Sequence, residues 1–255
     1  MSPQQKLLAL LPVAYLVGSI PFGLLVGLAR GVDVRKGGSG NIGATNVGRL
    51  LGGKFFALVF VLDLLKGLVP VLAAGALANF GGAVDGHPPT PTTFLLWLGV
   101  GFAAIAGHMF SVFLKFKGGK GVATSAGVIL GLFPFFTYPG LVAVGVWAAV
   151  FFARRIVSLA SIVGAAVFPL AYVAFALAAR WDLGVQWPLL AFAFLIGAMI
   201  VFRHRSNIAR LRAGTEARIG GGRRKHAGGN GDGHHAPGNG DGGADEGAAP
   251  GRPAR

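Results

Sequence analysis

Long apolar runs dominate this chain and limit what it can fold into. A helix needs about 20 residues to cross a hydrocarbon core of roughly 30 Å. Hydrophobic residues make up 53% of the chain and charged residues only 13%. We therefore predict an all-α polytopic membrane protein with about seven transmembrane helices. The predicted spans cover about residues 7–29, 55–79, 94–116, 122–136, 139–153, 156–179 and 187–202, of which the fourth, fifth and seventh are short.

Lys and Arg residues alternate with these runs and predict the orientation of the chain. They gather after the first, third, fifth and seventh runs, whereas the other connections hold only Lys6 and Arg180. Positively charged loops stay in the cytoplasm, so we expect the N-terminus outside and the C-terminus in the cytoplasm. The net charge of +14 lies on membrane-flanking loops, so it does not indicate a nucleic-acid-binding domain.

The composition changes sharply near residue 220. Residues 220–255 are rich in Gly, Pro, Ala and Asp, and the pentamer Gly-Asn-Gly-Asp-Gly occurs at 229–233 and again at 238–242. Such a segment buries too little apolar surface to fold. We predict a membrane domain over residues 1–219 and a disordered cytoplasmic tail over 220–255, with no metal role for the tail histidines. The chain has no cysteine, which excludes disulfides and thiolate chemistry.

The first basic loop mixes glycines with polar and cationic residues. Glycines let several N–H groups converge on one anion, and hydroxyl, amide and guanidinium groups add donors. A flexible linker is the alternative, but flexibility alone requires no polar residues between the glycines. A dinucleotide fingerprint is excluded because no strand–turn–helix unit surrounds the loop. The residues that favour an anion site are Gly38, Ser39, Gly40, Asn41, Gly43, Thr45, Asn46 and Arg49.

The second basic loop places a Gly-Gly-Lys-Gly turn at the start of a predicted helix. Its residues are Lys117, Gly118, Gly119, Lys120 and Gly121. Free N–H groups and the positive end of the helix dipole suit a phosphate there, with lysine as the countercharge. The alternative is that the lysines only follow the positive-inside rule for cytoplasmic loops and that the glycines form a hinge. The loop alone does not separate the two interpretations.

The remaining polar residues near the apolar runs fall into two groups. His204 and Asn207 share a face if the seventh helix continues, with Glu216 nearby to brace the arginines. A basic helix end is usually a headgroup anchor, which leaves the His and Asn unexplained. Asp63 and Lys66 stand three residues apart inside the second run, and we predict a structural intrahelical ion pair.

Six motifs in one order make the chain similar to a known family. They are Gly-Ser-Ile-Pro-Phe-Gly at 18–23, Gly-Ser-Gly-Asn-Ile-Gly-Ala-Thr-Asn at 38–46, Asp-Leu-Leu-Lys-Gly at 63–67, Gly-His-Met-Phe at 107–110, Phe-Lys-Gly-Gly-Lys-Gly-Val-Ala-Thr at 116–124 and His-x-x-Asn-Ile-x-Arg-Leu at 204–211. From about residue 14 to 220 the chain closely resembles the bacterial acyl-phosphate:glycerol-3-phosphate acyltransferases (the PlsY type).

The resemblance implies a seven-helix enzyme of the cell (inner) membrane with a cytoplasmic active site. Such an enzyme transfers a fatty acyl group from acyl phosphate to the 1-hydroxyl of glycerol 3-phosphate, giving lysophosphatidic acid and phosphate. Its partners are therefore acyl phosphate, glycerol 3-phosphate and membrane lipids. No nucleic acid, cofactor or metal ion is expected, because no carboxylates cluster beside the loops.

The resemblance also assigns roles to residues. Catalytic roles fall on Ser39, Arg49, His204 and Asn207, and a structural role falls on Glu216, while Asp63 and Lys66 keep the structural role of the predicted ion pair. Gly118, Gly119, Lys120 and Gly121 match the glycine-rich loop that the family is proposed to use for glycerol 3-phosphate. From the loop patterns themselves we add Lys117 and, in the first loop, Gly40, Asn41, Thr45 and Asn46 as predicted substrate-binding residues. His204 is the candidate general base, with a substrate phosphate as the alternative. The chain departs from the family at Ser111, where proline is usual.

Two other function classes fit parts of the pattern. A transporter for organic phosphates also needs basic sites near broken helices, but it places polar residues along a continuous path. A CDP-alcohol phosphotransferase needs several aspartates for metal ions, and only Asp33 and Asp63 lie near the right side. We therefore keep the transporter as the alternative to the acyltransferase.

Overall fold

The computed structural model describes residues 2–78 and 90–218, and these residues contain helices and no strand. The helices are α1 (Pro3–Ser19), α2 (Phe22–Leu28), α3 (Ala44–Leu51), α4 (Gly53–Leu77), α5 (Pro91–Met109), the short 3-10 helix η2 (Val112–Leu114), α6 (Val122–Gly131), α7 (Thr137–Arg154), α8 (Val157–Ala178), α9 (Leu183–Arg203) and α10 (Arg205–Arg212). The predicted tail after residue 219 and its histidines lie outside the described residues.

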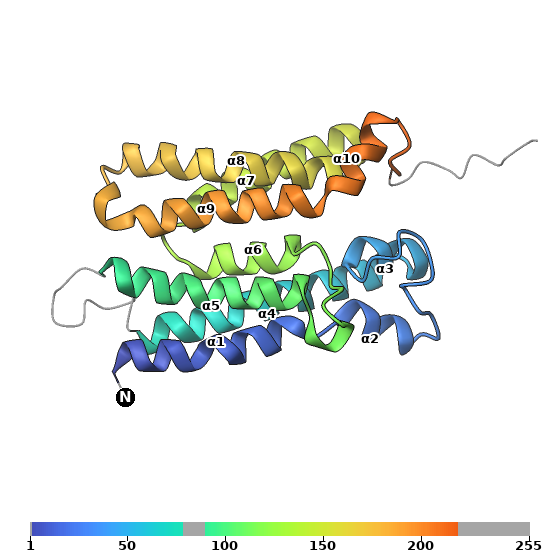
Figure 1. Cartoon of the computed structure of the whole chain (residues 1–255). Helices are drawn as coiled ribbons and strands as arrows, with labels where there is room; N and C mark the ends of the chain where they lie inside the picture. The colour runs from blue at the N-terminus through green and yellow to red at the C-terminus, as the bar shows by residue number, and fades with distance from the viewer. Residues whose placement is uncertain (1, 79–89, 219–255) are drawn as a thin grey trace, which may run out of the picture. The chain divides into compact units, whose positions relative to one another are not determined.

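The helices of residues 2–218 form two packed groups (Figure 1). In the first group α1 packs against α4 and α5, and α4 packs against α6. In the second group α8 packs against α7 and α9, and α9 also contacts α5. Helices α2, α3 and α10 lie at one end, which we call the basic end because of the side chains described below.

Six helical segments in the described residues are long and apolar enough to cross a membrane. The first is Pro3–Leu28, in which Pro21 separates α1 from α2 because a proline and the residue before it resist helical continuation. The predicted fourth span ends early: α6 has 10 residues and stops at Gly131, shortly before Pro134. At 1.5 Å per residue it is about 15 Å long, half of a hydrocarbon core.

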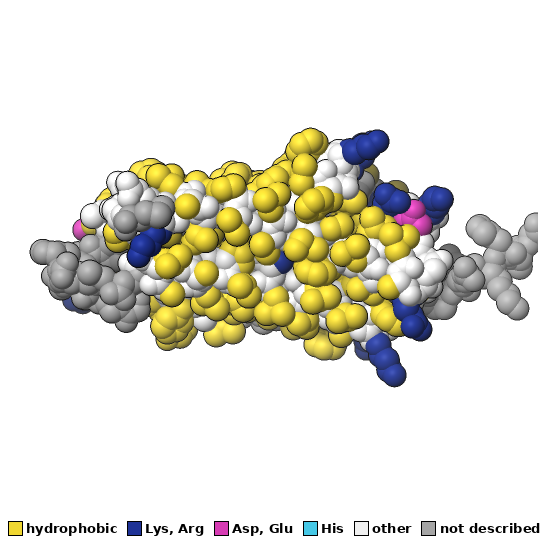
Figure 2. Space-filling view, turned by 90° about the horizontal axis from the view of Figure 1, so that it is seen from below, with side chains coloured by type: hydrophobic (Ala, Val, Ile, Leu, Met, Phe, Trp, Pro, Cys, Tyr) yellow, Lys and Arg dark blue, Asp and Glu magenta, His cyan; other side chains and the backbone are white. Residues whose placement is uncertain are grey.

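Apolar side chains cover the outside of the bundle. Val61, Leu72 and Val144 are each about half exposed, at 50%, 50% and 54%. Figure 2 shows hydrophobic side chains over the middle of one face, with most of the Lys and Arg on that face gathered at the basic end. A surface of this kind is stable against lipid and not against water. The protein is therefore a multi-pass membrane protein.

Glycines bring α4 and α6 into backbone contact. A Cβ on Gly67 would overlap the carbonyl oxygen of Thr124, and one on Gly127 would overlap that of Leu64. Small residues at such crossings are how membrane helices approach closely, since lipid provides no hydrophobic driving force between helices. This contact holds the short α6 inside the first group of helices.

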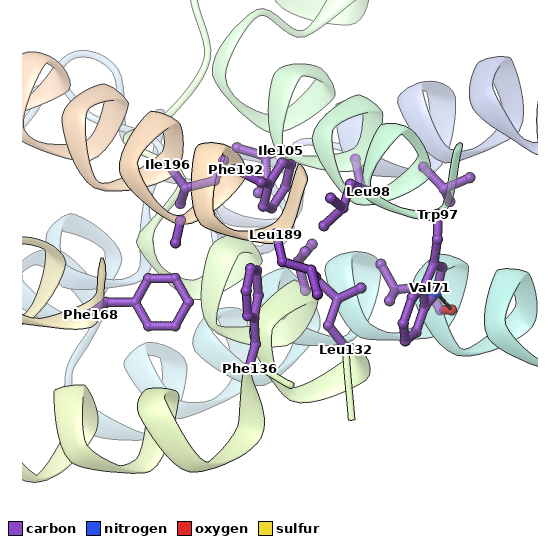
Figure 3. Close-up of a cluster of buried hydrophobic side chains, with 14 of the residues drawn as sticks. Val71, Trp97, Leu98, Ile105, Leu132, Phe136, Phe168, Leu189, Phe192 and Ile196 are labelled. Atoms are coloured by element: carbon purple, nitrogen blue, oxygen red, sulfur yellow. Dashed lines mark hydrogen bonds between the residues drawn. The ribbon is translucent and has the colours of Figure 1, made fainter. Parts of the chain in front are cut away.

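One cluster of buried apolar side chains contains residues of both groups of helices (Figure 3). Phe136, just before α7, meets Phe168 of α8 edge to face with 5.1 Å between ring centroids. It stacks on Phe192 of α9 at 6.1 Å. At the other side of the cluster the Trp97 indole N–H donates to the Val71 carbonyl at 3.0 Å, which ties α5 to α4. Edge-to-face and offset ring pairs stabilise such a core beyond area burial.

Candidate active site

The first loop is held together by one buried amide, that of Asn46 in the first turn of α3. Its Oδ1 accepts the N–H of Ser39 at 2.8 Å. Its Nδ2 donates to the carbonyls of Val34 and Gly37 at 2.8 and 3.1 Å. Asn46 is 1% exposed and has committed both ends of its amide to the loop backbone. Its geometry is that of a scaffold for Ser39.

The second loop folds back onto the end of α5. The N–H of Gly118 donates to the Met109 carbonyl at 3.1 Å, and the N–H of Gly119 donates to the His108 carbonyl at 3.0 Å. Both positions require glycine, because a Cβ on either would overlap His108. Gly121 then starts α6 at φ +84°, a conformation that favours glycine. The free N–H groups of the first turn of α6 therefore lie beside Lys120.

The polar segment after the last apolar run, residues 203–216, which we call the third segment, breaks at His204 between α9 and α10. The His204 Nδ1 lies 2.8 Å from the Ile200 carbonyl, so a neutral ring donates from Nδ1 and keeps Nε2 as an acceptor. Burial, with the nearby Lys120 charge, lowers the pKa of His204 to about 4. The ring is therefore neutral at pH 7.

A chain of hydrogen bonds links the second loop to the third segment. The Lys120 ammonium donates to Asn207 Oδ1 at 2.5 Å, and Asn207 Nδ2 donates to Glu216 Oε1 at 2.6 Å. Glu216 also accepts from Ser158 Oγ at 2.7 Å and from Arg210 Nε at 2.6 Å. These donors lower the pKa of Glu216 against the effect of burial, so the carboxylate is charged. Glu216 was expected to brace the arginines, and in the structure it contacts one arginine, one serine and one amide.

Burial has the opposite effect on the lysine. It lowers the pKa of Lys120 to about 8, the charge of Glu216 opposes this shift, and the charges of Arg210, Arg49 and Arg203 add to it. Lys120 is thus a cation at neutral pH that loses its proton more readily than an exposed lysine.

Ser39, Lys120, His204, Asn207 and Glu216 line one cavity of about 480 Å³ between the two groups of helices. Its polar wall is formed by Ser39, Asn41, Thr45, Asn46, Arg49, Asp63, His108, Lys120, Gly121, Ser125, Ser158, Ser161, His204, Asn207 and Glu216. The rest of its wall is apolar and includes Phe60, Ile129, Leu141, Val144, Trp147, Phe168, Ile196 and Ile200. A cationic, hydroxyl-rich end and a long apolar end suit a ligand with a phosphate head and an alkyl chain.

The predicted ion pair inside α4 is present, and His108 of α5 lies beside it. Lys66 Nζ lies 2.8 Å from Asp63 Oδ1 and donates to the Ile20 carbonyl at 2.8 Å. His108 Nδ1 lies 3.7 Å from the same carboxylate oxygen. All three side chains are nearly fully buried. Lys66 therefore links α4 to the break between α1 and α2, as a structural pair would.

Several predicted binding residues lie away from the large cavity. Gly40, Lys117 and Gly118 line a second cavity of about 400 Å³, together with Arg35, Ile42, Phe116 and Arg203, and Asn41 borders both cavities. Gly119 lines neither and packs on the His108 ring. Ser111, at the departure from the family pattern, donates to the Ser19 carbonyl at 2.6 Å and so fastens the loop to α1.

Sequence reasoning missed Ser158, Ser125 and the contribution of His108 to the cavity wall. The two serines are small residues and His108 is a lone histidine, and all three lie in or beside apolar runs. A serine in a membrane helix commonly bonds its own backbone, so the residue type alone carried no signal. Among the described residues no group of three or more His, Asp or Glu side chains could hold a metal ion.

The comparisons with known proteins agree on one family. Residues 8–214 match the family model described as glycerol-3-phosphate acyltransferase. The chain is 48% identical over 221 residues to the glycerol-3-phosphate acyltransferase of Roseiflexus sp. (strain RS-1), covering 86% of this chain and 98% of that protein. It is 44% identical over 215 residues to that of Aquifex aeolicus (strain VF5), covering 84% of this chain and all of that protein.

Solved structures give the same result. The crystal structure of PlsY, an integral membrane glycerol 3-phosphate acyltransferase, in its glycerol 3-phosphate form superposes with a TM-score of 0.70 at 41% identity. Its lysophosphatidic acid form superposes with a TM-score of 0.69 at the same identity. Each covers 84% of this chain and 96% of the solved chain.

Proposed function

The chain belongs to the glycerol-3-phosphate acyltransferase family, and we propose that its cavity transfers a fatty acyl group from acyl phosphate to the sn-1 hydroxyl of glycerol 3-phosphate. The protein is an integral membrane enzyme that acylates glycerol 3-phosphate in phospholipid synthesis. The observation that carries the proposal is the continuity of the cationic end and the apolar end in one cavity.

Glycerol 3-phosphate occupies the start of α6 in this proposal. Lys120 supplies the countercharge, and the free N–H groups of the first turn of α6 supply donors to the phosphate. Asn207 and Glu216 hold Lys120 in place through the chain of hydrogen bonds. Because Asn207 uses both ends of its amide in that chain, its role is to orient Lys120.

Acyl phosphate lies with its head at Ser39 and Arg49 and its alkyl chain along the apolar wall. The glycerol oxygen attacks the acyl carbonyl, the bond from that carbon to the phosphate oxygen breaks, and phosphate leaves. Acyl phosphate is already activated, so positioning and donors to the developing oxyanion supply most of the rate. No covalent acyl-enzyme and no metal ion are needed.

The proton of the glycerol hydroxyl goes to a phosphate oxygen. His204 has a pKa of about 4, below that of a phosphate monoester at about 6, so the phosphate is the stronger base. The neutral Nε2 of His204 accepts the hydroxyl hydrogen bond and aims the oxygen at the carbonyl. The proposed active site faces the cytoplasm, because the basic end carries most of the Lys and Arg on the face seen in Figure 2.

A donor assay tests the proposal. Purified protein in detergent receives glycerol 3-phosphate and either acyl phosphate, acyl-CoA or an acyl carrier protein thioester, with EDTA present, and release of phosphate and lysophosphatidic acid is followed. We expect turnover with acyl phosphate alone. Turnover with a thioester only, or loss of turnover in EDTA, would refute the proposed donor or the metal independence.

The same assay tests the residues. Arg49→Ala and Lys120→Ala should each lower kcat/KM by about 100-fold, the usual loss when one charge-stabilising donor is removed, while the protein still inserts and purifies. Lys54→Ala is the matched control, because Lys54 is an exposed cation at the start of α4 that lines neither cavity. Full activity in both cavity variants would show that the phosphates bind elsewhere. The transporter alternative finds no support, since the relatives named above are acyltransferases.

A further inference from the structure

Arg203 is the last residue of α9, and its side chain takes a different direction from that of its neighbour in sequence. His204 lines the large cavity of about 480 Å³. Arg203 lines the second cavity of about 400 Å³, which also holds Lys117 and Gly118. Two consecutive residues therefore reach the two cavities that border the glycine-rich loop.

The guanidinium of Arg203 binds the backbone of the loop. Its Nη2 donates to the carbonyls of Gly119 at 2.7 Å and Gly118 at 3.1 Å, with a longer contact to Met109 at 3.4 Å. The guanidinium carbon also lies over the Phe110 ring, 5.5 Å from its centroid. One side chain thus fastens the end of α5 to the fold-back of the loop. No carboxylate contacts Arg203 within the described part of the chain, so its polar partners there are backbone carbonyls.

These contacts decide where the N–H groups of the loop point. In a trans peptide unit the C=O and the following N–H point in opposite directions. The Gly118 carbonyl faces Arg203, and the N–H of Gly119 in the same unit donates to the opposite side, to the His108 carbonyl at 3.0 Å. By the same geometry, the Gly119 carbonyl bound by Arg203 turns the Lys120 N–H away from Arg203. That N–H has no hydrogen-bond acceptor among residues 2–78 and 90–218.

We propose that Arg203 is a positioning residue for phosphate binding: it fixes the peptide plane between Gly119 and Lys120 so that the Lys120 N–H and the start of α6 face the phosphate of glycerol 3-phosphate. The proposal rests on the proposed function, which places that phosphate beside Lys120. Arg203 touches no substrate in this arrangement. Its effect on binding passes through the backbone of the loop.

Arg205 is a matched control for Arg203. It lies two residues further on, at the start of α10, and is exposed. Its guanidinium carbon lies over the Phe202 ring, 4.9 Å from the centroid, and it donates to no loop carbonyl. Arg203→Gln and Arg205→Gln therefore remove the same charge from the same helix junction, and only the first releases the loop.

Steady-state kinetics with both substrates varied separately test the proposal. Arg203→Gln should raise the KM for glycerol 3-phosphate by about tenfold or more, because a misplaced binding group loses much of its contribution. The KM for acyl phosphate should change less, and Arg205→Gln should match the unchanged protein. Arg203→Lys should fall between, since an ammonium can donate to a carbonyl but lacks the planar fork of arginine. If Arg203→Gln does not purify, Arg203→Lys carries the same test.

Two results would overturn the inference. One is an Arg203→Gln enzyme with the kinetics of Arg205→Gln. The other is an equal loss in kcat and in both KM values that follows a loss of thermal stability, because a purely structural residue gives that pattern. Lys120→Ala separates this inference from the proposed function: an unchanged KM for glycerol 3-phosphate in that variant would remove the phosphate from the loop, whatever Arg203 does.

Discussion

Lys120, Asn207 and Glu216 are the residues through which the second loop meets the segment around α10. Each has a neighbour that alters its chemistry: the amide of Asn207 orients the lysine, and the carboxylate of Glu216 orients the amide. Burial leaves Lys120 with a pKa of about 8, so its charge is available at neutral pH and is lost at moderately alkaline pH. The lowered pKa of Lys120 therefore predicts that the activity depends on pH.

We expect kcat/KM for glycerol 3-phosphate to rise through about pH 6, as the phosphate takes its second charge. It should fall above about pH 8, because the lowered pKa means that Lys120 loses its proton there and binds the dianion less well. Lys120→Arg should lack the alkaline fall, at reduced activity, since a guanidinium stays charged. A pH–rate profile measures this, and an alkaline limb that persists in Lys120→Arg would assign it to another group.

At the scale of helices, the short α6 is the element that makes the site. At about 15 Å it is about half as long as a hydrocarbon core is thick. Gly121 and Val122 at its N-terminus line the cavity, so its free N–H groups lie beside that cavity. Its backbone contact with α4 through Gly67 and Gly127 keeps it there. Helix packing thus sets the depth of the proposed phosphate site.

Gly127→Ala should destabilise the protein by about 1–3 kcal/mol, because the new methyl group overlaps the Leu64 carbonyl and forces α4 and α6 apart. Gly145→Ala is the control: it adds the same methyl group inside α7, where no atom lies within 4 Å of the new Cβ, and it should leave stability unchanged or slightly higher. Thermal unfolding in detergent compares the two. Equal melting temperatures would show that the α4–α6 contact yields easily.

At the scale of the whole molecule, the cavity lies between two packed groups of helices that share one cluster of buried apolar side chains. The acyl end of the proposed site belongs to both groups, whereas the phosphate end is built from the loops of the basic end. The family model ends at residue 214, so the matched region contains the whole cavity except Glu216.

Removing residues 221–255 should leave kcat/KM within about twofold of the full chain, because every cavity residue precedes the cut and the composition of the tail does not favour folding. The donor assay on the truncated enzyme measures this. A loss of tenfold or more, in protein that still inserts, would show that the tail takes part in activity and would contradict its prediction as a disordered extension.

The sequence by itself determined the membrane class, the helical architecture and the family. Long apolar runs have only helices or closed barrels as solutions in lipid, and six motifs in one order identify the acyltransferases. It also located the three polar segments, because charged residues are rare in such a chain. These are local properties, and they can be recognised without knowing which segments meet.

Only the tertiary structure decided which residues of those segments share a cavity. Asn46, predicted to bind substrate, lines the large cavity and also bonds the loop backbone through its amide, while Lys117 and Gly118 border a different cavity from Lys120. The predicted fourth span is longer than α6, because packing on α4 and the proline that follows set the C-terminal end of the helix. In the sequence Arg203 looks like any other basic residue at a helix end. Only the structure shows that it donates to the loop carbonyls of Gly118 and Gly119. The role of a residue depends on the residues that it contacts, and these are often distant in the sequence. The sequence pattern does not show which distant residues come into contact.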